Sequence, residues 1–389
     1  YLRNPEYRSR VQKLVQSAFA GKPEDIISQS VAKALYGEVS PYSATRLERF
    51  AACAFAHFLQ YGMKLTERVE YDFKPMDMGN VMHEALESFA EEVRKRGMKW
   101  TELTEQERNE IADRCLDNIV ADYGNTVLKS SARNEYMIER TRRILRRTVW
   151  ALQKQLEQGE FQPEGFEVTF GGGRIDRVDI MEDQNKVYVK VIDYKTGNTS
   201  FDLVYLYHGL QLQLMIYLDG ALRVEQKKYP DKEIIPAGVF YYNIKDPMIQ
   251  EKIDADVEAV SAGLMKELKM NGLVQADPEL VYRMDSSLGS IPVAFNKDGS
   301  FRKNSSVADR TQFAVLGRYV RTKIEKIRSS ILEGDAEVSP YELGKKNACT
   351  YCPYMTVCGF DRRLLGYEFR RLKNFSDEEL WKAFDREAE

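Results

Sequence analysis

The sequence contains little that would place this protein in a membrane or outside the cell. No run of eighteen apolar residues occurs, so no membrane-spanning helix is expected. The first ten residues are polar and charged, unlike a signal peptide. Five cysteines in 389 residues are too few, and odd in number, for a disulfide framework. We therefore expect a cytoplasmic protein, and we ask whether its cysteines cluster as metal ligands.

A strong net charge is also absent. The 57 basic and 60 acidic residues leave a formal charge of −3, so any DNA-binding surface must be local. No G-x-x-x-x-G-K-[ST] motif is present, so we expect no ATP binding. The chain begins with Tyr1 rather than Met, and we expect it to be a fragment of a longer protein. Hydrophobic residues make up 43% of the chain, enough for a sizeable core.

Hydrophobic periodicity predicts a group of helices followed by a compact set of strands. Residues 1–40 are expected to be helical and polar, and Ser43 is the expected N-cap of the next helix. Helices are predicted at 44–61, 79–96, 104–122, 134–158, 206–225, 251–271 and 311–333. Strands are predicted at 166–170, 174–180, 187–194 and 238–244, and 272–305 is expected to be irregular. This order predicts an α/β fold with a small mixed sheet flanked by helices.

The segment VIDYKTG carries the central chemical signal. Its Asp193 and Lys195 share one face of a predicted strand because strand side chains alternate. One hairpin earlier, GRIDRVD supplies Asp176, which can approach Asp193 from the neighbouring strand, while Asp179 points the other way. Two converging carboxylates are what Mg²⁺ usually takes from protein. An isolated D-x-K is more often a surface ion pair, so the inference depends on the two motifs together.

Two predicted helices carry polar residues in otherwise apolar runs. Gln213 and Tyr217 are four residues apart and so share a helical face. A buried amide without a partner costs about 1–3 kcal/mol, so we expect Gln211 or Gln213 to meet a polar site. His83 shares a face with Glu87; a lone helical histidine is more often a core residue than a ligand. The H-E-x-x-H spacing is absent, which argues against a zinc protease.

Taken in order, G-x-x-x-H-x-x-L-E, GRIDRVD, DYKTG and Q-L-x-x-Y resemble the RecB-family branch of the PD-(D/E)xK nucleases. The resemblance implies a restriction-endonuclease-like core and a Mg²⁺-dependent deoxyribonuclease. It implies metal ligation by His83, Glu167, Asp176 and Asp193, with Glu167 assigned by position alone. It implies catalytic or supporting roles for Asp176, Asp193, Lys195, Gln213 and Tyr217.

The C-terminal region contains C-x2-C-x5-C, formed by Cys349, Cys352 and Cys358. Three closely spaced thiols seldom occur without a metal. Cys53 is the expected fourth ligand, whereas Cys115 lies on a predicted helix and is expected in the core. A four-cysteine site can hold zinc or a cubane cluster, although zinc sites usually consist of two C-x-x-C pairs.

One distant cysteine plus a trio resembles the iron staple of AddB-type subunits and of CRISPR-associated RecB-like exonucleases. The resemblance implies a structural [4Fe–4S] cluster that closes a loop of about 300 residues and joins the two ends of the domain. It implies that residues 1–40 are the tail of a helicase-like region and that 41–389 form the nuclease domain. A longer insertion normally separates the strand at 166–170 from Gly173 in that family.

The expected function is Mg²⁺-dependent exonucleolytic cleavage of single-stranded DNA from a helicase, in the 5′-to-3′ direction, during double-strand-break processing for homologous recombination. The implied partner is an AddA-type helicase–nuclease subunit. Two alternatives stay open: a stand-alone CRISPR-associated-type exonuclease, and a catalytically silent Fe–S module that guides DNA or braces a partner. The basic segment Arg140–Arg147 is either a phosphate contact or a solvated helix face.

Overall fold

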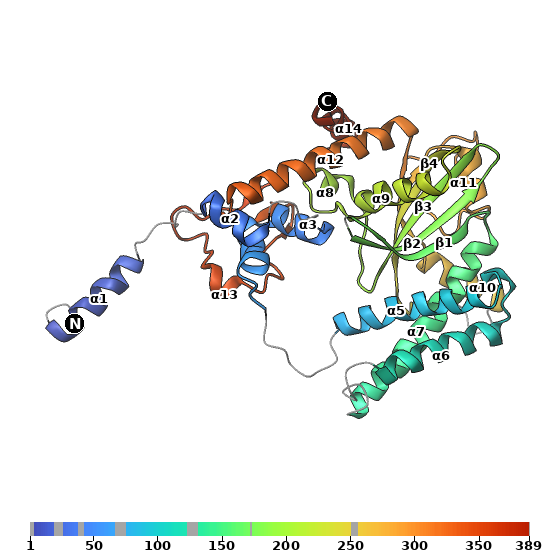
Figure 1. The fold of residues 1–389 in the computed structure, drawn as a ribbon, viewed down its shortest axis with the longest axis horizontal. Coiled ribbons are helices and arrows are strands. Elements are labelled where there is room, and N and C mark those ends of the chain that lie inside the picture. Colours follow the sequence, from blue (N-terminus) through green and yellow to red (C-terminus); the bar gives the residue numbers. More distant parts are fainter. Residues whose placement is uncertain are drawn as a thin grey trace. The chain divides into compact units, whose positions relative to one another are not determined.

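The computed structural model describes residues 4–18, 26–37, 43–66, 75–122, 131–171, 173–249 and 256–388. The chain divides into two compact units (Figure 1). The first unit contains residues 1–68, 204–210 and 321–387, and the second contains 69–203, 211–320 and 388–389. Among the described residues, no helix combines the length and the apolar character needed to cross a membrane.

A six-stranded mixed sheet forms the centre of the second unit, and its strands lie in chain order. The strands are β1 (Gln162–Phe170), β2 (Gly173–Glu182), β3 (Lys186–Lys195), β4 (Glu233–Asn243), β5 (Asn271–Gln275) and β6 (Val307–Ala308). The first three strands are antiparallel, β4 runs parallel to β3, β5 is antiparallel to β4, and β6 is parallel to β5. The predicted α/β fold with a mixed sheet is therefore confirmed.

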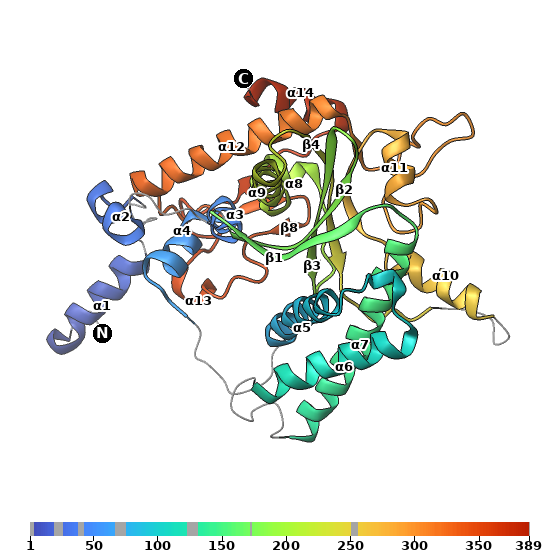
Figure 2. The same ribbon diagram turned by 45° about the vertical axis from the view of Figure 1, so that its right-hand side comes forward.

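Helices cover both faces of this sheet (Figure 2). On one side α9 (Gln213–Lys228) contacts β2, β3 and β4. On the other side α5 (Pro75–Lys95), α6 (Glu105–Asp122) and α7 (Ala132–Glu157) pack together over a core that includes Ile192 and Tyr194. The central strands β2 and β3 are buried on both faces because helices cover both faces.

The predicted helix over 206–225 is confirmed for residues 213–225 but wrong as one continuous helix, because the chain is interrupted between α8 (Leu203–Tyr207) and α9. Gly209 adopts a left-handed backbone with φ 77°, which a glycine enters without steric cost. Gln213 is consequently the first residue of α9 rather than a mid-helix residue. Gln211 lies before the helix and binds the backbone of Ser200 and Asp202.

The interpretation of residues 251–305 is also corrected. The helix α10 is only Val257–Glu267, capped by Asp256, whose carboxylate accepts the Ala259 amide hydrogen at 2.7 Å. Residues 251–255 of the prediction lie outside the described residues. The predicted helix ends before residue 271, and the region 272–305 expected to be irregular contains most of β5 (Asn271–Gln275) and α11 (Pro278–Met284). The short 3-10 helix Trp100–Glu102 precedes α6.

The first unit contains all four cysteines of the predicted cluster. Its helices are α1 (Pro5–Ala18), α2 (Gln29–Tyr36), α3 (Ala44–Ala52), α4 (Ala54–His57), the π-helix Phe58–Gly62, α13 (Met355–Cys358) and α14 (Asp377–Ala388). The long helix α12 (Arg310–Glu333) has residues in both units. A small sheet has the order β8 (Lys346–Asn347), β7 (Tyr341–Leu343), β9 (Arg370–Arg371).

The continuous helix predicted for 44–61 is wrong at one position, since Cys53 has an extended backbone between α3 and α4. The Phe55 amide donates to the Glu337 carbonyl at 2.9 Å, a tertiary bond that takes the place of a helical one. Ser43 caps α3 as predicted. The break directs Cys53 into a small core with Tyr354 and Cys352.

Candidate metal centre and cysteine cluster

Three carboxylates lie in one row across β1, β2 and β3. The β2–β3 register pairs Arg177 with Ile192, so the next residues, Asp176 and Asp193, are cross-strand neighbours. The β1–β2 register pairs Phe166 with Arg177 and Val168 with Ile175, so Glu167 lies opposite Asp176. Glu167 has a left-handed backbone (φ 50°), a strained state for a residue with a Cβ. Such strain is typical of functional positions.

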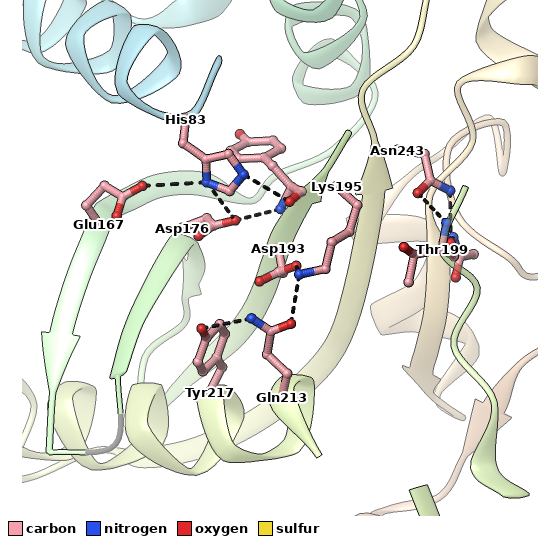
Figure 3. A network of polar contacts seen from close by, with 11 residues as sticks. His83, Glu167, Asp176, Asp193, Lys195, Thr199, Gln213, Tyr217 and Asn243 are labelled. Atoms are coloured by element: carbon pink, nitrogen blue, oxygen red, sulfur yellow. Dashed lines mark hydrogen bonds and ion pairs between the residues drawn. The ribbon is translucent and has the colours of Figure 1, made fainter. Parts of the chain in front are cut away.

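His83 reaches this row from α5 (Figure 3). Its Nε2 lies 3.1 Å from the Tyr194 carbonyl oxygen, which can only accept, so Nε2 carries the proton. The other nitrogen, Nδ1, lies 3.4 Å from Asp176 Oδ2 and 3.9 Å from Glu167 Oε1. A histidine held by a backbone carbonyl through one nitrogen, with the other facing carboxylates, has the arrangement of a metal ligand.

The electrostatics of the row favour a cation. Burial and the neighbouring Asp176 raise the pKa of Glu167 to about 7, and the same two causes raise the pKa of Asp193 to about 7. Burial alone would lower the pKa of His83, but the carboxylates around it raise the pKa overall. Asp193 Oδ2 is buried without an aligned hydrogen bond, although Lys195 Nζ lies 2.5 Å away. The fold therefore holds the negative charges of Glu167, Asp176 and Asp193 close together.

Lys195 is fixed by a chain of contacts with α9. Its ammonium donates to Gln213 Oε1 at 2.8 Å, and Gln213 Nε2 donates to the Tyr217 hydroxyl at 2.9 Å (Figure 3). Gln213 and Tyr217 thus lie on one helix face, as their spacing predicted. The Lys195 side chain is 27% exposed, so its ammonium borders solvent while its stem is held.

His83 and Glu167 border a cleft of about 530 Å³. It is lined by Gly79, Asn80, His83, Glu84, Glu87, Glu167, Arg174 and Thr196. Asn80 and Thr196 were not singled out from the sequence. Asn80 lies three residues before His83 and so on the same helix face, which is the signal that could have identified it. Arg174 forms a close ion pair with Glu167 at the exposed edge.

The residues present fit a divalent cation. Among the described residues, one group of potential ligands has its donor atoms all within 4.8 Å of one another, and it consists of His83, Glu167 and Asp176. Carboxylate oxygens are ligands that Mg²⁺ and Mn²⁺ accept, and the cleft leaves room for water and a phosphate. Asp193 lies beside this group but outside it, paired with Lys195.

The four predicted cysteine ligands line one small cavity in the first unit. Its walls combine Cys53, Cys349, Cys352 and Cys358 with mainly apolar residues, among them Phe55, Val338, Pro340 and Tyr354. Burial, together with the charges of the other three thiols, raises the pKa of Cys349 to about 12. Among the described residues, the one group of three potential metal ligands within 4.8 Å of one another is His83, Glu167 and Asp176. No three of the four cysteine sulfur atoms therefore lie this close together. Cys115 is buried in the other unit, as expected for a core residue.

The comparison with known families agrees with this geometry. The family model described as the PD-(D/E)XK nuclease superfamily matches residues 41–359. The chain therefore belongs to the PD-(D/E)XK nuclease superfamily, and its mixed sheet with flanking helices is that fold.

Within that class the chain is similar to proteins named as the B subunits of ATP-dependent helicase/deoxyribonucleases. It is 42% identical to the one from Lachnoclostridium phytofermentans over 98% of this chain and 35% of that protein. It is 34% identical to those from Thermoanaerobacter sp. and Clostridium acetobutylicum, over 100% of this chain and 36% of each relative. The chain thus spans about a third of the length of these relatives.

Proposed function

We propose that this chain is the nuclease domain of an AddB-type helicase–nuclease subunit and that it hydrolyses phosphodiester bonds of single-stranded DNA with Mg²⁺. The observation that supports this most is the acidic row Glu167, Asp176 and Asp193, with His83 and Lys195 at its ends. The names of the similar proteins, which pair a helicase with a deoxyribonuclease, support the wider role.

Hydrolysis forms a bond between a water oxygen and phosphorus and breaks the bond to the leaving oxygen. The water loses a proton and the leaving oxygen gains one. A divalent cation held by His83 and the carboxylates would supply Lewis-acid stabilisation and a more acidic bound water. Lys195, held by Gln213, would place its ammonium beside the attacked phosphate and orient the nucleophilic water. Tyr217 would keep the Gln213 amide from rotating.

Further parts of the proposal concern the whole protein. Cutting proceeds from 5′ to 3′ on a strand delivered by a helicase, during double-strand-break processing for homologous recombination. The similar proteins are each named as one subunit of a larger enzyme, which supports the presence of a second subunit. We propose that this partner is an AddA-type helicase–nuclease.

The catalytic proposal is tested on the intact protein with 5′-labelled single-stranded DNA. Wild type should release nucleotides only with Mg²⁺ or Mn²⁺. Asp193→Asn and Lys195→Ala should each lower kcat at least ~100-fold, the size of effect seen when one charge-stabilising group is lost. Asp183→Asn, at the tip of the same hairpin, is the matched control and should keep full activity. Equal activity of Asp193→Asn and wild type would remove the catalytic assignment and leave the silent-module alternative.

We also propose that the four cysteines hold a [4Fe–4S] cluster. In a tetrahedral zinc site with Zn–S bonds of about 2.3 Å, the sulfur atoms lie about 3.8 Å apart. The wider spacing of these thiols supports a larger group, and the apolar walls support a buried cluster. Protein purified without oxygen should be brown and contain about four irons per chain, and Cys352→Ala should lose them while Cys115→Ser keeps them. A colourless protein with one zinc would overturn this assignment.

A further inference from the structure

A second hollow in the same unit shares no lining residue with the acidic cleft. It is a groove of about 690 Å³ between α6, α7 and α10. Its walls contain six arginines, Arg108, Arg140, Arg142, Arg143, Arg146 and Arg147, against only two glutamates, Glu105 and Glu139. In a chain whose net charge is −3, this is a local concentration of positive charge.

One stripe of α7 gives the groove its pattern. Tyr136, Arg140, Arg143, Arg147 and Trp150 all line it and follow one another at steps of four and three residues. That spacing keeps all five side chains on one helix face. The opposite face of α7 is buried in the core through Ile144, Leu145, Thr148, Val149 and Leu152. The stripe is therefore presented outward by a helix whose position is fixed by packing.

The arginines are of two kinds. Arg142 and Arg146 are held by ion pairs with Asp113 and, for Arg142, Asp117. Arg140 is exposed and forms no ion pair within the described part of the chain. Arg143 pairs with Asp246 at 2.6 Å, and Arg147 Nε lies 4.0 Å from the other oxygen of the same carboxylate. Arg143 is exposed, and exposed pairs stabilise a fold by about 0–1 kcal/mol, so a phosphate can replace that carboxylate.

Aromatic side chains stand at both ends of the stripe. Tyr136 is 64% exposed, an unusual position for a tyrosine that serves only packing. At the other end the Arg147 guanidinium lies 5.4 Å from the centre of the Trp150 ring. Tyr136 is exposed and Trp150 is half-buried. Accessible rings interleaved with guanidinium groups are the combination that binds unpaired bases and phosphates together, because rings stack on bases and arginines contact the backbone.

We propose that this groove is a binding track for single-stranded nucleic acid, separate from the acidic cleft. The proposal rests on the proposed function, since it concerns how the substrate strand is held. The stripe from Tyr136 to Trp150 is about 21 Å long at 1.5 Å per residue. At about 3.4 Å per stacked nucleotide it accommodates roughly six nucleotides. An acidic protein surface would match the charge but would leave the exposed Tyr136 ring unexplained.

The test measures binding of a fluorescent single-stranded oligonucleotide of mixed sequence at several salt concentrations. The intact protein is used with Asp193→Asn as background, so that the strand is not cut. Each phosphate contact contributes about 0.7 to the slope of log affinity against log salt for single strands. Arg140→Gln, Arg143→Gln and Arg147→Gln combined should therefore lower the slope by about 2. The matched control combines Arg114→Gln, Arg223→Gln and Arg318→Gln, exposed arginines that line neither hollow, and should keep the slope.

The aromatic end is tested separately. Tyr136→Ala should weaken binding about tenfold at every salt concentration, the value of one stacked base, whereas Tyr136→Phe should bind like the parent. An unchanged slope in the triple glutamine variant would overturn the proposal. This holds even if the variant no longer binds an acidic protein partner, because the proposal concerns nucleic acid. Failure of the nuclease proposal would look different: protein with an intact Asp193 would not cut DNA with any divalent cation, while the slope would still differ between variant and control.

Discussion

The buried carboxylate of Asp179 should be among the most sensitive positions in the molecule. It is fully buried on the face of β2 opposite Asp176. It accepts from Arg177 Nε and Nη2 at 2.5 and 2.9 Å, and Lys190 Nζ lies 2.9 Å away. Asp179→Asn preserves the shape but leaves two cations in the core without an anion. Breaking a buried ion pair costs about 3–5 kcal/mol, so urea unfolding should show a loss of that size. At 2–4 °C per kcal/mol, Tm should fall by about 6–20 °C.

The effect should also depend on pH. Burial alone would raise the pKa of Asp179, but the charges of Arg177 and Lys190 outweigh it and hold the pKa below its usual value. A carboxylate with a lowered pKa stabilises the folded state above its unfolded pKa of about 3.9, and this stabilisation is lost as pH falls through the folded pKa. The difference between wild type and Asp179→Asn should therefore be full at pH 7 and shrink below pH 4. Asp183→Asn, at an exposed position, should stay within ~0.5 kcal/mol of wild type. A loss below ~1 kcal/mol at pH 7, or a difference unchanged at pH 3, would refute this reasoning.

Three further outcomes are expected from the sites themselves. In steady-state nuclease assays, Gln213→Ala should lower kcat at least ~10-fold without changing Tm. Tyr217→Phe removes one hydrogen bond of about 1 kcal/mol and should lower kcat about fivefold. Equal effects of the two variants on kcat would mean that Tyr217 acts directly. His83→Ala should raise the Mn²⁺ concentration for half-maximal activity at least ~10-fold, measured by metal titration, and an unchanged midpoint would exclude it as a ligand. Cys53→Ala should lower the Tm of anaerobically purified protein by several degrees, while Cys115→Ser should leave its iron content unaltered; equal melting of wild type and Cys53→Ala would argue against a structural cluster.

The row of acids was predictable only in part. Asp176 and Asp193 could be placed together because a hairpin of antiparallel strands has a period of two and the motifs lie on its two arms. Glu167 could be assigned only by position, since its approach depends on a left-handed backbone that no local pattern encodes. Its ligand role and those of the other site residues stay predictions.

The errors in secondary structure have one common cause. Cys53 lies in a sequence whose apolar periodicity fits a helix, and 272–275 lies in a stretch expected to be irregular, yet each takes another conformation because of contacts distant in sequence. Phe55 donates to Glu337 instead of continuing a helix, and 271–275 completes a ladder with β4. Local periodicity weighs only neighbours along the chain, so tertiary hydrogen bonds of this kind override it.

The two aspartates of β2 show how one strand can serve stability and chemistry at once. Asp179 faces the core and is matched by two cations of the protein itself, so its charge stabilises the fold. Asp176, three residues earlier and on the other face, meets Glu167, Asp193 and His83, where Arg174 and Lys195 pair with the outer acids. The covered sheet holds these acids together although burial and the repulsion from Asp176 raise the pKa of both flanking carboxyls. A site under such repulsion gains stability from any divalent cation that enters it. Added Mn²⁺ should therefore raise the Tm of wild type, and should do so less in Asp176→Asn.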